Sequence, residues 1–158
     1  LQGVRRGEVQ LELIDQMTVL LGGRVAEQIV FGDVTTGAAN DLQRVAEITH
    51  AMIHDYAMGS NQAPQATPAD DMVSDLSRRI RDEEQRELAF EAHRAAWGLI
   101  DGHRTLLERF AQELLTNEVL ERPEIDAIME GAAGDDGRPV GEVRLAASIR
   151  RAERPPTA

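Results

Sequence analysis

The chain has 158 residues, of which 17 are Lys or Arg and 28 are Asp or Glu, so its formal net charge is −11. This acidic balance argues against nucleic acid and anionic membrane surfaces as partners, because both are themselves negative. The absence of cysteine excludes disulfides, thiol nucleophiles and thiolate metal sites. The sequence contains no apolar run of the roughly 18–20 residues that a membrane span needs.

The first predicted element is a helix over residues 8–31. Its apolar residues recur at steps of three and four, the spacing of one helical face; they are Leu13, Met17, Leu20 or Leu21, Val25 and Ile29. Gly22-Gly23 interrupts this pattern and indicates either a break or a close helix–helix contact. We favour close packing, because the apolar phase continues across the pair.

A turn-rich loop over residues 32–40 leads into a second predicted helix, from Asp41 to about Met58. Thr36, Asn40 or Asp41 could cap its start. The expected inner face consists of Val45, Ile48, Met52 and either Ile53 or Tyr56. Residues 59–71 contain two prolines and almost no apolar side chains, so they are interpreted as a linker.

The third segment, from Met72 to about Asn117, is expected to be one long helix or a helical hairpin that turns at Asp101-Gly102. A short helix over residues 123–130 follows. The expected fold is mainly α, with a folded portion over residues 1–130 and a loosely ordered Gly/Pro/Arg-rich tail over residues 131–158. The tail carries a net +1, so the helical portion carries −12.

The sequence contains no glycine-rich phosphate loop, no G-x-S-x-G elbow and no H-E-x-x-H zinc helix. His50 and His54 are four residues apart and could share a helix face, but a solvated surface pair is the better interpretation. His93 and His103 are read as ordinary helix residues, since neither has a matched partner. Trp97 is read as a core anchor, and the acidic run at 82–84 as a solvated face.

Asp41 differs from these residues because it is in phase with the apolar stripe of its helix and should point inward. A buried carboxylate is costly unless it caps a helix, pairs with a cation or coordinates a metal. The residue pattern alone leaves two interpretations open. Asp41 either supplies a charge that favours the helix dipole or has a functional role.

Residues 20–60 read LLGGRVAEQIVFGDVTTGAANDLQRVAEITHAMIHDYAMGS. This run closely resembles the peptidase domain of the FtsH family, the membrane-anchored AAA+ zinc metalloproteases. Most matches are glycine and polar identities that core packing alone does not select; they are Gly22-Gly23-Arg24, Ala26-Glu27, Phe31-Gly32, Thr35-Thr36-Gly37-Ala38, Asn40-Asp41 and Met58-Gly59-Ser60. The resemblance continues more weakly to Met129, so it covers roughly residues 11–129.

The resemblance implies a zinc site made by two histidines of an H-E-x-x-H helix and one aspartate, and it assigns Asp41 as that third ligand. His50 and His54 cannot replace the missing histidines, because on the same helix they point roughly 140–180° away from Asp41. We therefore expect zinc in a complete parent enzyme but no zinc bound by this chain alone. The resemblance likewise places ATP in a AAA domain outside these residues.

By the same resemblance, the parent would degrade unfolded or membrane proteins as a homo-oligomer, a hexamer in the family, at the cytoplasmic face of a membrane. Its membrane anchor would also lie outside these residues. One departure from the family is the short linker that follows residue 60, where relatives have a longer segment. This departure favours the alternative interpretation, a non-catalytic helical oligomerisation or adaptor module that kept the fold and lost the chemistry.

Overall fold

The computed structural model describes residues 6–60, 73–130 and 132, and every regular element over these residues is a helix. The mainly α fold expected from the sequence is therefore confirmed. The elements in chain order are α1 (Arg6–Phe31), the 3₁₀ helix η1 (Thr36–Ala38), α2 (Ala39–His50), the π-helix η2 (Ala51–Asp55), α3 (Asp75–Asp101), α4 (Arg104–Asn117) and α5 (Arg122–Met129). None of them combines the length and the apolar content that a bilayer span requires.

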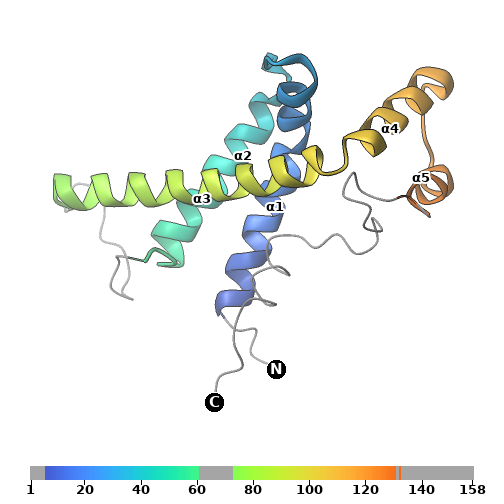
Figure 1. Cartoon of the computed structure of the whole chain (residues 1–158). Coiled ribbons are helices and arrows are strands. Elements are labelled where there is room, and N and C mark those ends of the chain that lie inside the picture. The colour runs from blue at the N-terminus through green and yellow to red at the C-terminus, as the bar shows by residue number, and fades with distance from the viewer. Residues whose placement is uncertain (1–5, 61–72, 131, 133–158) are drawn as a thin grey trace.

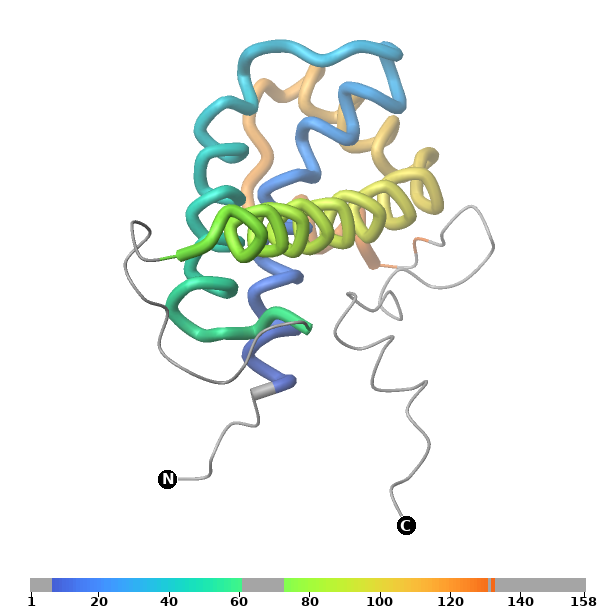
Figure 2. Tube along the Cα trace, turned by 90° about the vertical axis from the view of Figure 1, so that its left-hand side faces the viewer, coloured from blue at the N-terminus to red at the C-terminus, as the bar shows by residue number. Residues whose placement is uncertain are grey.

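α1 and α2 form an antiparallel hairpin, and α3 crosses both of them (Figure 1, Figure 2). The core lies where the three helices meet, because each turns an apolar stripe toward the other two. Its central side chains are Ile14, Met17, Val25, Met52 and Ile53, each fully buried. Ala92 and Ala96 of α3 are 0% and 2% exposed and let that helix approach α1 closely.

α1 runs without a break through Gly22 and Gly23, so of the two alternatives only close packing of another helix on this pair remains. A Cβ built on either glycine has no atom within 4 Å apart from its own helix. The expected close helix–helix packing at this pair is therefore wrong within the described part of the chain. The apolar phase continues because the glycines lie beside the buried stripe of Leu21 and Val25, not on it.

The second predicted helix exists, but it is divided between α2 and η2. None of the three expected capping side chains caps α2; the hydroxyl of Thr35 instead accepts a bond from the Gly37 N–H, at the start of η1. At the other end Met58 N–H donates to the carbonyl of Met52, 2.8 Å away, and Ala57 adopts a left-handed φ of 46°. Such a bond and a left-handed residue are typical of a helix C-terminus.

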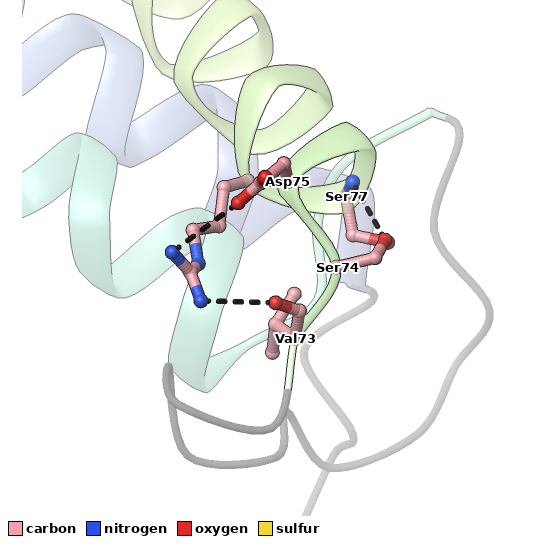
Figure 3. Close-up of polar contacts among 5 residues, drawn as sticks. Val73, Ser74, Asp75 and Ser77 are labelled. Atoms are coloured by element: carbon pink, nitrogen blue, oxygen red, sulfur yellow. Dashed lines mark hydrogen bonds and ion pairs between the residues drawn. The ribbon is translucent and has the colours of Figure 1, made fainter.

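The third predicted segment consists of two helices, α3 and α4, which separate at the expected Asp101-Gly102 turn, but α4 runs on away from the end of α3 and does not fold back on it as a hairpin (Figure 1). The N-terminus of α3 is capped by Ser74, whose hydroxyl accepts a bond from Ser77 N–H (Figure 3). Arg78 pairs with Asp75 and also donates to the carbonyl of Val73. These contacts define where α3 begins.

α4 and α5 project from one end of α3 (Figure 1) and form a small second cluster around Leu106 and Ile128. The predicted final helix is confirmed with bounds one residue earlier at each end. Leu115 and Val119 remain 79% and 68% exposed on this part of the chain. The linker expected over 59–71 and the tail over 131–158 fall almost entirely outside the described residues, as do the domain bounds that depend on them.

Two side-chain expectations are wrong. Trp97 is 40% exposed and lies against His93, so it is not a core anchor. Glu84 is only 4% exposed, although its neighbours Asp82 and Glu83 lie on the surface as expected. Both errors have one cause: α3 is long, and only the residues that cross α1 and α2 are covered, a limit set by tertiary packing and not by periodicity.

Candidate metal-ligand site

Asp41 lies in the first turn of α2, four residues before the buried Val45. Its side chain is half-buried. It is therefore less covered than its phase with the apolar residues of the helix predicted. A carboxylate here is favoured by the positive end of the helix dipole. The position therefore offers a charged oxygen ligand that is both anchored by a helix and open on one side.

The loop before α2 is tied to α1 by Glu27. Its carboxylate accepts the Thr35 N–H at 3.0 Å and the Thr35 hydroxyl at 3.0 and 3.1 Å to its two oxygens. The hydroxyl oxygen of Thr35 in turn accepts the Gly37 N–H, and Ala38 is buried directly before α2. This chain of contacts sets where α2 begins and so where Asp41 lies.

Reasoning from residue types missed Glu27. An acidic residue on a helix is usually solvated, and its partner lies eight residues further on, beyond any helical spacing. The run Thr35-Thr36-Gly37 was the one sequence signal for this contact, because a hydroxyl beside a tight turn usually has a hydrogen-bond partner nearby.

The four histidines do not gather around Asp41. His50 and His54 stack on each other at the other end of α2, His93 bonds to Gln28, and His103 bonds to the carbonyl of Leu99. Among the residues that the structure describes, no three His, Cys, Asp or Glu side chains come together as a metal site. The chain thus presents a carboxylate at Asp41, and the described ranges contain no complete zinc-binding set.

A separate cavity of about 330 Å³ lies between α1, η2 and α3. It is lined by Glu84, Glu87 and Glu91 together with Ser60 and Gly59, among other residues. The buried Glu84 accepts a hydrogen bond from the Ser60 hydroxyl at 3.4 Å, and a Cβ on Gly59 would collide with its carboxylate. The end of the Met58-Gly59-Ser60 run is therefore shaped around this one side chain.

Comparison with known proteins agrees with this arrangement. The family model of peptidase family M41 matches residues 6–128. This range contains α1 to α4, all of α5 except Met129, the Glu27–Thr35 contact and Asp41, so it covers nearly the whole described structure. The chain belongs to peptidase family M41.

Individual relatives point the same way. The chain is 42% identical over 130 residues to the ATP-dependent zinc metalloprotease FtsH of Burkholderia pseudomallei, which covers 72% of this chain and 19% of that protein. It is 37% identical over 134 residues to the Ralstonia pickettii protein of the same name, with 75% and 19% covered. For FtsH 4 of Sorangium cellulosum the values are 34% over 160 residues, with 85% and 25% covered. The chain thus spans about a fifth to a quarter of the length of these relatives.

Proposed function

We propose that this chain is part of an ATP-dependent zinc metalloendopeptidase and that Asp41 supplies the third ligand of its catalytic zinc. The observation that carries this proposal is the placement of Asp41 in the first turn of α2, inside the range matched by the peptidase family model. The proposal has two parts, the metal ligand and the helical scaffold that holds it, and they rest on different contacts.

The chemistry of Asp41 suits the role. A carboxylate oxygen is a normal third partner for two imidazoles in a catalytic zinc site that keeps one position open. Zinc bound in this way supplies an activated water for peptide hydrolysis. Asp41 would hold one side of the ion, and the two histidines and the base glutamate would come from an H-E-x-x-H helix that these 158 residues do not contain.

The helices around Asp41 hold its backbone in place. α3 covers α1 and α2 on one side, and Glu27 fixes the loop that starts α2. A ligand that must meet a metal within a few tenths of an ångström benefits from such a fixed backbone. The parent protein would use a AAA domain to feed unfolded or membrane proteins to this site, as a homo-oligomer at the cytoplasmic face of a membrane.

The test is an Asp41→Asn substitution in the full-length protein, with Asp82→Asn as the control because Asp82 is an exposed carboxylate on α3. Proteolysis of casein should fall by at least tenfold in Asp41→Asn, while ATP hydrolysis stays at the parental rate. Asp82→Asn should leave both activities unchanged. Full proteolysis by Asp41→Asn would remove Asp41 from the ligand set.

The alternative, a non-catalytic oligomerisation or adaptor module, predicts a different result for the same protein. It expects no zinc-dependent proteolysis in the parental chain and no effect of Asp41→Asn on assembly. An in-frame H-E-x-x-H and a Walker A motif upstream of residue 1 would exclude this alternative before any assay.

A further inference from the structure

His50 and His54 are not simply two solvated side chains. His50 is the last residue of α2, His54 lies in the π-helix η2, and their rings stack with centroids 4.0 Å apart and an interplanar angle of 2°. His50 is exposed and His54 half-buried, so the pair is open to solvent on one side. A π-turn inside a helix is rare and is often found at functional sites.

A third group comes from the opposite helix. The side-chain amide nitrogen of Gln85, on α3, lies 3.3 Å from Nε2 of His54. The nitrogen and oxygen of a glutamine amide exchange places by a flip of the group. Gln85 therefore presents either an N–H donor or a carbonyl oxygen at the same point beside the imidazole.

We propose that His50, His54 and Gln85 form a surface site for a late first-row divalent metal ion such as Ni²⁺ or Cu²⁺. Imidazole nitrogen suits these ions, and the Gln85 oxygen adds a third ligand after a flip. The rings are stacked and do not converge on one point, so metal binding at this site requires one ring to turn about χ2, a soft torsion in histidine. The net charge of −11 attracts cations to the surface.

This site is separate from the proposed catalytic zinc. It lies at the opposite end of α2 from Asp41, and it uses residues of η2 and α3 that the Asp41 proposal does not need. A bound ion would join the end of α2 and η2 to α3 and so brace the hairpin against the crossing helix.

The experiment is an NMR titration of the whole chain with Ni²⁺, a paramagnetic ion that broadens the signals of nearby protons. The chain has four histidines, so each ring can be followed separately. We expect the ring signals of His50 and His54 to broaden at a ratio of one ion per chain, before those of His93 and His103. His50→Ala and His54→Ala should each weaken Ni²⁺ binding at least tenfold, and Gln85→Leu should weaken it several-fold.

His93→Ala is the matched control, because it removes a half-buried histidine that bonds to Gln28 elsewhere in the fold. It should leave the affinity unchanged, and so should Asp41→Ala, which separates this site from the catalytic one. Equal broadening of all four rings, no saturation up to about 1 mM Ni²⁺, or unchanged binding by His50→Ala would overturn the proposal. Unchanged binding by Gln85→Leu would remove the amide from the ligand set and contradict the site as proposed.

Discussion

Thr35 connects the loop after α1 to α1 itself through both of its polar groups, the N–H and the hydroxyl. Both groups bond to Glu27, and the same hydroxyl oxygen accepts the Gly37 N–H at 3.3 Å. Thr35 thus fixes the backbone four residues before α2 begins. At the residue scale, this contact is what places Asp41.

Replacing Thr35 with Val keeps the shape of the side chain and removes its hydroxyl. We expect hydrogen exchange at the Gly37 amide to accelerate by about tenfold, and the free energy of unfolding to fall by no more than about 1 kcal/mol, because the contact is exposed. Glu27→Gln should act in the same direction. Thr36→Val is the control. If hydrogen exchange at the Gly37 amide accelerates as much in Thr36→Val, the order of the loop does not depend on the contact between Thr35 and Glu27.

Gly59 is the second residue with a specific steric role. A Cβ at this position would collide with the carboxylate of the buried Glu84. Gly59 does not adopt a left-handed φ, so the effect of a side chain there is steric and not conformational.

We therefore expect Gly59→Ala to lower the free energy of unfolding by no more than about 1 kcal/mol, measured by urea denaturation, because the atoms it meets are the end of the Glu84 side chain, which can shift. Gly98→Ala is the matched control, because a Cβ there meets nothing within 4 Å and a helical alanine should be neutral or stabilising. A Gly59→Ala variant as stable as Gly98→Ala would mean that Glu84 moves freely away from this position.

α1 is the element whose behaviour departs most from expectation. It contains two adjacent glycines, yet it runs unbroken from Arg6 to Phe31 and makes no close contact at either glycine within the described chain. Glycine is costly in a helix interior because its backbone loses more conformational freedom on folding. The remaining contacts of α1, chiefly with α3, keep the helix intact.

Gly23→Ala should accordingly raise the free energy of unfolding of this chain by about 1 kcal/mol, which corresponds to about 2–4 °C in Tm for a domain of this size. Gly7→Ala, in the first turn of α1, should change Tm less. A lower Tm for Gly23→Ala would show that another part of the chain packs on the glycine.

The crossing of α1 and α3 depends on small residues. Ala92 is 0% exposed, and its carbonyl lies 3.5 Å from the hydroxyl of the buried Thr18 on α1. A larger side chain at this position must push the two helices apart. The closeness of these helices is therefore set by the alanines on α3.

Ala92→Leu should destabilise the chain by about 1–3 kcal/mol through overpacking, as seen in chemical denaturation. Ala111→Leu provides the comparison, because Ala111 is exposed on α4 and leucine is a good helix former. Similar stability of the two variants would mean that α3 does not press on α1 at Ala92.

Over the whole molecule, the sequence pattern predicted the helices better than their contacts. Periodicity placed α1, α3 with its turn at Gly102, and α5 within a few residues, because each carries an apolar stripe and clear end signals. It did not distinguish Ile53, which is buried, from Tyr56, which is 52% exposed, since the π-turn at η2 shifts the phase of the helix between them.

The same difference between local and distant signals applies to the candidate site. Asp41 is predicted from its helical phase and from the motif around it, both of which are local. Glu27, Glu84 and Gln85 are not, because their partners Thr35, Ser60 and His54 lie 8, 24 and 31 residues away in the sequence. Such contacts depend on how α1, α2 and α3 pack, and no local pattern encodes that packing.

The central claim concerns one oxygen–metal bond. It is tested most directly by a crystal structure of the full-length protein with zinc, with the ion located by its anomalous scattering. We expect a carboxylate oxygen of Asp41 at about 2.0–2.2 Å from the zinc, together with two histidine nitrogens from outside these 158 residues. A zinc site whose ligand set is complete without Asp41 would contradict the account.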